Sequence, residues 1–113
     1  MQLTERTVGD VTLFDLGGRL ILDDGLEPLR LAVDQAIAEG RHKLLLNFSG
    51  VTYLDSAGVG LIAFKYATLC RNNGQMKLCN LGPRVYRVLE TTKLLTVFQP
   101  FTSEADALKG FTG

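Results

Sequence analysis

The stretch Asp55-Ser56-Ala57-Gly58-Val59-Gly60-Leu61 is the most informative part of the chain. It predicts a polar turn that opens an amphipathic helix, with the Ser56 hydroxyl at the N-terminal end of that helix. This end is electropositive, and its backbone N–H groups lack partners within the helix. A serine there is either an ordinary helix cap, which composition alone favours, or an acceptor for phosphate. Most of the functional question therefore depends on Ser56.

The helix expected after Ser56, which runs to about Arg71, carries apolar residues on two sides. Leu61 and Phe64 fall on the side that points away from the expected sheet. Either a neighbouring helix covers them, or they form a partner-binding patch beside Ser56. The side that should pack on the sheet contains Val59, Ile62, Ala63, Tyr66, Leu69 and Cys70.

Two glycines, Gly58 and Gly60, occupy the first turn of this helix, where each costs up to about 1 kcal/mol relative to alanine. Such small residues leave the Ser56 hydroxyl open and let another backbone approach closely. They also allow the helix to pack tightly on a sheet, and both explanations can hold. No Glu or Gln follows three residues after Ser56, so the sequence contains no capping box at this point.

Strands and helices alternate along the rest of the chain, in the order ββαβαβα(β)α. Val8-Gly9-Asp10-Val11 predicts a tight hairpin turn, and Gly17-Gly18 is expected to end the second strand. This order predicts an α/β fold with a mixed sheet of four to five strands, backed by about four helices. The expected strands cover residues 3–8, 11–16, 44–48 and 75–81, with a possible edge strand at 96–101; the expected helices begin near residues 26, 57, 83 and 103.

The size and charge of the chain narrow the functional classes. With 113 residues it is most simply one domain over 1–113, and its 12 basic and 12 acidic residues give a formal net charge of zero. No basic block indicates a nucleic-acid partner. The N-terminus lacks the apolar core of a signal peptide, and no apolar run approaches the roughly 18 residues of a membrane span. We therefore expect a cytoplasmic protein without membrane insertion, of open oligomeric state.

Two enzymatic interpretations compete with these expectations, and both are weak. Residues 58–63 match the dinucleotide-binding pattern G-x-G-x-x-A. However, residues 49–55 are expected to separate the preceding strand from the helix, Asn80 stands where an acidic residue is wanted, and the chain is short for a two-halved nucleotide fold. A serine hydrolase would need a base near Ser56, and only His42 is available, without a G-x-S-x-G elbow.

The cysteines, Cys70 and Cys79, do not form a C-x-x-C pair and are expected to be reduced thiols in the core. With only His42 to assist them, they predict no metal site. The sequence therefore predicts neither an enzyme nor a bound cofactor.

The segment Leu46-Asn47-Phe48-Ser49-Gly50-Val51-Thr52-Tyr53-Leu54-Asp55-Ser56-Ala57-Gly58-Val59-Gly60-Leu61 closely resembles the signature of STAS domains, and more narrowly that of bacterial anti-sigma factor antagonists. The resemblance runs through nearly the whole chain, from the opening hairpin that ends in Gly18-Arg19-Leu20 to the tail at 85–108. It implies the STAS fold for a single domain.

The resemblance also implies a phosphorylation switch. In the family the serine of this loop is the phosphoacceptor, which corresponds here to Ser56. The unmodified antagonist binds an anti-sigma factor serine kinase and frees the sigma factor, phosphorylation releases the antagonist, and a metal-dependent serine phosphatase restores it. Asp55 would then help to position the serine or its partners, while Gly58 would keep the loop open.

One departure concerns the family pattern Gly-x-Leu-Asp after the second strand, since Ile21 follows Leu20 here and acidic residues appear only at Asp23 and Asp24. Either aspartate can stand in for the family residue. An alternative is a STAS scaffold that does not switch, for example a subunit of a lipid-transport ATPase or of a stress-signalling complex. The expected partner-binding surface consists of Asp23, Asp24, Asp55, Ser56, Ala57, Gly58, Gly60, Leu61 and Phe64.

Overall fold

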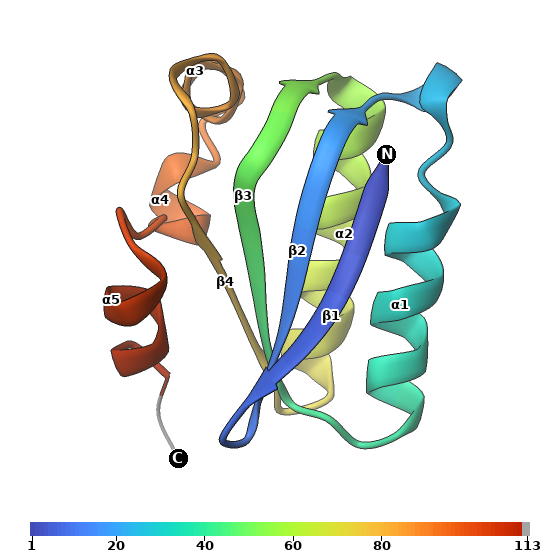
Figure 1. The fold of residues 1–113 in the computed structure, drawn as a ribbon, viewed down its shortest axis with the longest axis vertical. Helices are drawn as coiled ribbons and strands as arrows, with labels where there is room; N and C mark the ends of the chain where they lie inside the picture. The colour runs from blue at the N-terminus through green and yellow to red at the C-terminus, as the bar shows by residue number, and fades with distance from the viewer. Residues whose placement is uncertain (112–113) are drawn as a thin grey trace.

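A computed structural model describes residues 1–111, apart from the side chain of Asp24. Strands and helices alternate after an opening hairpin, as the sequence predicts (Figure 1). The elements in chain order are β1 (Gln2–Val8), β2 (Val11–Leu20), the short 3-10 helix η1 (Leu22–Asp24), α1 (Glu27–Ala38), β3 (Lys43–Leu54), α2 (Ser56–Arg71), β4 (Gln75–Cys79), α3 (Pro83–Thr91), α4 (Leu95–Phe98) and α5 (Glu104–Lys109).

The four strands form one mixed sheet in the order β1-β2-β3-β4. β1 pairs antiparallel with β2, whereas β2 with β3 and β3 with β4 pair in parallel. The predicted hairpin is confirmed, because Val8 pairs with Val11 and Gly9 adopts a φ of 60°, which suits a glycine in a tight turn. Helices α1 and α2 cover one face of this sheet, and α3, α4 and α5 lie beyond β4 (Figure 1).

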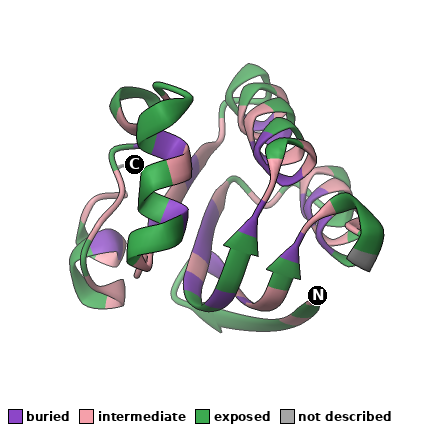
Figure 2. Ribbon diagram, turned by 90° about the horizontal axis from the view of Figure 1, so that it is seen from above, coloured by how far each residue is buried: buried purple, intermediate pink, exposed green. Residues whose placement is uncertain are grey.

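The core has two parts, one on each face of the sheet. The main cluster lies under α1, α2 and α3, and a smaller one lies under α5. The side chains of Leu44, Leu45 and Leu46 have no exposed surface, because Leu44 and Leu46 face the main cluster while Leu45 faces the smaller one. This confirms that the unbroken apolar run marks a strand buried on both faces. Figure 2 shows buried residues on the inner sides of the helices and along the strands between them.

The possible fifth strand at 96–101 is wrong for most of its length. Residues 95–98 form the helical turn α4, and Phe98 is buried in the main cluster, with its ring 5.1 Å from that of Tyr66 in an edge-to-face contact. Only Phe101 makes a single parallel bridge, with Cys79. Burial of Phe98 therefore outweighs the strand preference of Thr96 and Val97.

Two strands are longer than the sequence predicts. β2 continues through Gly17-Gly18 to Leu20, with irregular pairing to β3 at that point and a φ of 80° at Gly18. β3 reaches Leu54, so the expected segment between strand and helix is strand as well. Only Asp55 separates β3 from α2, which gives a tight strand-to-helix turn.

Candidate functional site

The first turn of α2 is capped by Asp55, not by Ser56. The backbone of Asp55 is extended, and its carboxylate Oδ1 accepts a hydrogen bond from the Gly58 N–H at 2.9 Å. This is the geometry of an N-cap residue, in which a side-chain oxygen satisfies one of the free N–H groups of the helix. Composition alone favours Ser56 as an ordinary helix cap. This expectation is wrong, because the cap is the preceding residue, Asp55.

Asp55 also joins the end of β2 to the start of α2. Its Oδ2 accepts a hydrogen bond from the Leu22 N–H at 3.1 Å, and its own N–H donates to the Leu20 carbonyl at 3.3 Å. The hydrogen bond from the Gly58 N–H lowers the pKa of Asp55. Burial opposes this to a lesser extent, and the bond from the Leu22 N–H lowers the pKa further. The carboxylate is thus held ionised beside the serine.

Ser56 is the first residue of α2, and its side chain is exposed. Among residues 1–111, the Ser56 hydroxyl makes no hydrogen bond. The strand-to-helix turn and the cap at Asp55 therefore hold the backbone in place while the serine hydroxyl stays accessible. A hydroxyl in this position can accept a phosphoryl group without loss of an existing contact.

The two glycines of the first turn have different roles. A Cβ on Gly58 would lie 2.4 Å from the Leu20 carbonyl oxygen and 2.7 Å from a methyl group of Leu54, so Gly58 lets α2 pack tightly on the sheet. Gly58 is buried in this packing, and its direct contact with a partner stays a prediction. A Cβ on Gly60 would meet nothing within 4 Å, and Gly60 is exposed beside Ser56.

The apolar residues near Ser56 divide in the same way. Phe64 is 62% exposed, whereas Leu61 packs in part against the main cluster. On a helix, positions 56, 60 and 64 lie one turn apart, so Ser56, Gly60 and Phe64 share one exposed stripe. Leu22 in η1 is 70% exposed and is held next to α2 through Asp55. No sequence pattern indicated Leu22, since a single exposed leucine has no periodicity.

The structure thus brings most of the predicted partner-binding residues to one end of the molecule. Asp23 is exposed in η1, Ala57 and Asp55 are half-buried at the start of α2, and the stripe described above runs from there along α2. The side chain of Asp24 lies outside the described residues, so the choice between Asp23 and Asp24 stays open.

An ion pair holds α2 against α1. The Lys65 ammonium lies 2.6 Å from the Asp34 carboxylate, and Lys65 itself is buried between the helices. Its Nζ also lies 5.5 Å from the centroid of the Phe64 ring, a distance at which a cation is attracted to the ring face. Lys65 was predicted neither as a core nor as a site residue, because a lysine within a helix usually marks its solvent side.

The geometry bears on both enzymatic interpretations. His42 precedes the first residue of β3 and Ser56 follows its end, so these two residues lie at opposite ends of a 12-residue strand. The objection that residues 49–55 form a separate segment does not hold, since the strand runs to Leu54. However, the Gly58 N–H, which a dinucleotide phosphate would need at a helix start, is occupied by Asp55.

The cysteines also differ from the expectation. Cys79 is buried, and burial raises its pKa to about 11, but Cys70 is exposed rather than in the core.

Among the described helices, none is both long enough and apolar enough to cross a membrane.

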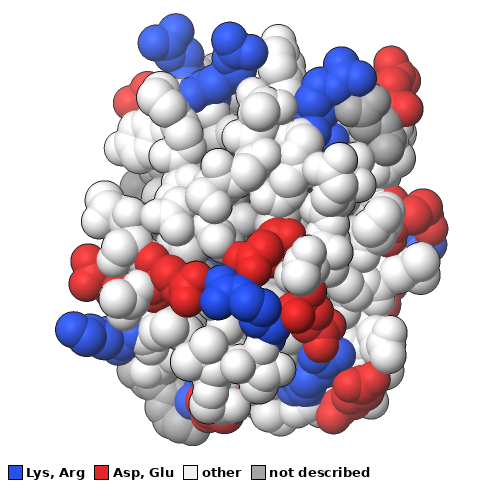
Figure 3. Space-filling model, viewed as in Figure 1, with Lys and Arg blue, Asp and Glu red and all other residues white. Residues whose placement is uncertain are grey.

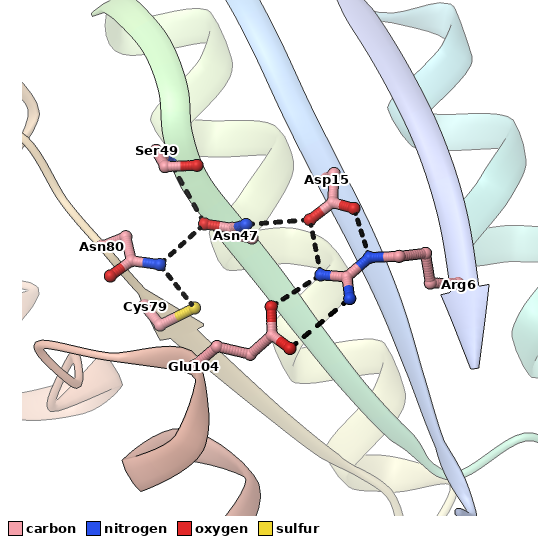
Figure 4. Close-up of polar contacts among 7 residues, drawn as sticks. All are labelled: Arg6, Asp15, Asn47, Ser49, Cys79, Asn80 and Glu104. Carbon is pink, nitrogen blue, oxygen red and sulfur yellow. Dashed lines mark hydrogen bonds and ion pairs between the residues drawn. The ribbon is translucent and has the colours of Figure 1, made fainter. Parts of the chain in front are cut away.

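A polar network lies on the sheet face opposite α1 and α2 (Figure 4). The Arg6 guanidinium lies 2.6 Å from the Asp15 carboxylate and 2.6 Å from that of Glu104, which fastens α5 to the opening hairpin. Arg6 holds the pKa of Asp15 below its usual range. Asn47 links the network to β4, since it donates to Asp15 at 2.8 Å and accepts from Asn80 at 3.0 Å. The network connects elements remote in sequence, so no local pattern could predict it.

The chain folds as a mixed four-stranded α/β domain, with an exposed serine at the start of α2. Residues 5–107 match the STAS domain family, and the chain belongs to this family. A relative, the anti-sigma F factor antagonist of Paenibacillus polymyxa, is 27% identical over 81 residues, which is 71% of this chain and 69% of that protein.

Solved structures with the same fold include SpoIIAA in two forms. The anti-sigma factor antagonist SpoIIAA in its unphosphorylated form is 24% identical, with a TM-score of 0.80 over 99% of this chain and 100% of that chain. The Bacillus cell fate determinant SpoIIAA in the phosphorylated form is also 24% identical, with a TM-score of 0.76 over 96% of this chain and 97% of that chain. These likenesses confirm the predicted STAS fold.

Proposed function

We propose that this STAS domain is an anti-sigma factor antagonist controlled at Ser56. The form with an unmodified serine binds an anti-sigma factor serine kinase, and phosphorylation of Ser56 switches binding off. The observation that carries the proposal is the exposed hydroxyl of Ser56, which has no side-chain hydrogen bond among residues 1–111 although its neighbour Asp55 has two. The names of the relatives support the same function.

The physical chemistry of the site suits a switch that changes the surface and not the fold. A phosphate adds about −1.5 to −2 charges at neutral pH. The positive end of the α2 dipole favours a negative charge at its first residue, so the helix should survive the modification. The ionised Asp55 lies next to the new charge and repels it. A partner that packs on Phe64 and Gly60 would have to desolvate this dianion, and binding should fall.

The exposure of Ser56 also suits the reverse reaction. A metal-dependent serine phosphatase must reach the phosphorylated residue from solvent, and an exposed first residue of a helix allows this. We therefore include such a phosphatase among the proposed partners.

The test compares Ser56→Asp with the unmodified chain in affinity capture from a lysate of the source organism, with ADP present. We expect the wild type to capture a small ATP-binding kinase and the variant to lose it. Ser49→Asp is the matched control, because it introduces the same charge at another exposed serine, on β3.

The outcomes separate the proposal from the alternative. Equal capture of the kinase by wild type and Ser56→Asp would show that Ser56 is no switch. If both capture a lipid-transport ATPase, the domain is a scaffold subunit of that complex. If Ser49→Asp loses the kinase as well, the effect is one of net charge and not of the site.

A further inference from the structure

Helix α3 carries cations that the rest of the fold does not neutralise. Arg84 and Arg87 have no acidic partner among the described residues, although they lie on an exposed helix. Five basic side chains on other elements contact a carboxylate: Arg6, Arg30, Arg41, Lys43 and Lys65. Helix α3 also carries the exposed Glu90, so Arg84 and Arg87 leave it with a net charge of +1, whereas the whole chain has none.

An aromatic ring fixes one of these arginines near the switch. The Arg84 guanidinium lies 5.2 Å from the centroid of the Tyr53 ring, and Tyr53 is 47% exposed near the end of β3. A cation–π contact of this kind uses none of the guanidinium N–H donors in a hydrogen bond, so they can meet a carboxylate. Tyr53 precedes Ser56 by three residues, so their Cα atoms are at most about 11 Å apart.

The surface around these arginines is hollowed and partly apolar. One hollow of about 290 Å³ is lined by both arginines together with Val88, Thr91 and Thr92. A second, of about 230 Å³, lies at the start of the helix and is lined by both arginines and Pro83. Figure 3 shows Lys and Arg side chains gathered over α3, at the end of the molecule where β2 and β3 terminate in Figure 1.

We infer that this surface, which we call the α3 basic face (Tyr53, Arg84, Arg87, Val88 and Thr91), docks an acidic segment of a protein partner. Two free guanidinium groups beside an apolar side chain fit carboxylates spaced on a helix or strand that also carries apolar residues. A nucleic acid would need a longer basic surface than two arginines on a neutral chain. Under the proposed function the partner is the anti-sigma factor that meets Ser56, so the partner's identity, but not the surface, rests on that proposal.

The test measures binding of a fluorescein-labelled peptide of alternating Glu and Leu pairs by fluorescence anisotropy, at low and at physiological salt. A peptide with Gln in place of every Glu is its neutral counterpart. We expect the acidic peptide to bind, more tightly at low salt, and Arg84→Gln/Arg87→Gln to weaken binding roughly fivefold or more, since each exposed ion pair accounts for a few-fold.

The matched control is Arg71→Gln/Lys109→Gln, which removes the same charge from exposed positions on α2 and α5 and should leave binding unchanged. Equal loss in both double variants, equal binding of the neutral peptide, tighter binding of a single-stranded oligonucleotide, or no binding at the highest soluble concentration would each overturn the inference. The assay contains no kinase, so its result and the failure of the proposed function are independent.

Discussion

At the start of α2, two neighbouring side chains have separate roles. Asp55 makes the local hydrogen bonds, with the Gly58 and Leu22 N–H groups, and so fixes the end of β2 and the first helical turn together. Ser56 is left with an exposed hydroxyl. A residue that both capped the helix and accepted phosphate would break the cap on modification. The division allows the chemistry at Ser56 to change without removal of the capping side chain.

The role of Asp55 predicts a defined dependence of stability on pH. Its pKa is lowered in the folded state, so the unfolded chain binds a proton more readily. The stabilisation is therefore complete above the unfolded pKa of about 3.9 and is lost as the pH falls through the lower folded value. We expect Asp55→Ala to reduce the free energy of unfolding by about 0.5–2 kcal/mol at pH 7, as for other lost N-caps.

Urea unfolding of wild type and Asp55→Ala across the acid range would measure this difference. It should shrink as the pH falls below 4, because Asp55 takes up a proton in the unfolded chain before it does so in the folded state. Ala57→Gly in the same turn is a control whose cost should not change with pH. A difference between wild type and Asp55→Ala that stays constant down to the lowest pH would contradict the assigned role.

At the scale of elements, the position of α2 depends on the contact between its first turn and the end of β2. Gly58→Ala places a methyl group against the Leu20 carbonyl oxygen, and backbone cannot move away as a flexible side chain can. We expect it to lower the free energy of unfolding by about 1–3 kcal/mol, the usual cost of overpacking. Gly60→Ala is the matched substitution two residues along, in open space, and should stabilise the helix by up to about 1 kcal/mol.

Chemical denaturation of the two alanine variants gives both values. Opposite signs are the expected result, because the two glycines differ in surroundings and not in helix propensity. If both variants were stabilised to the same extent, α2 would not pack as closely on β2 as the structure shows.

The sequence predicted most elements, and the failures have physical causes. The run Leu44-Leu45-Leu46 and the hairpin at Gly9 carry local signals, a doubly buried strand and a turn glycine, and both were confirmed. The segment 96–101 contains strand-forming residues, but residues 95–98 are helical because Phe98 packs in the main cluster against Tyr66. Which apolar residue finds a place in a distant cluster cannot be read from its neighbours in the chain.

For the candidate site, the sequence located the serine but not its surroundings. The Asp-Ser-x-Gly pattern identified the loop, whereas the exchange of roles between Asp55 and Ser56 depends on one residue of helix register. The contact of the Arg84 guanidinium with the Tyr53 ring joins residues 31 positions apart and has no signature in either segment.

For the whole molecule, the proposed switch at Ser56 lies at the end of β3 opposite to its most buried part. The leucines near the start of β3 have no exposed surface, while Asp55 joins η1 to the first turn of α2. A new charge at Ser56 repels the Asp55 carboxylate and weakens its bond to the Leu22 N–H. The centre of the sheet is too well packed to respond to so small a displacement.

We therefore predict that Ser56→Asp accelerates amide hydrogen exchange in η1 and in the first turn of α2, and leaves β3 and β4 unchanged. The free energy of unfolding should change by no more than about 0.5 kcal/mol, since the favourable charge–dipole contact offsets the repulsion from Asp55. Ser49→Asp, on the exposed face of β3, should leave η1 unaffected. Faster exchange throughout β3 and β4 in Ser56→Asp would show that the charge loosens the whole domain; loss of a partner would then reflect partial unfolding rather than a change at the surface.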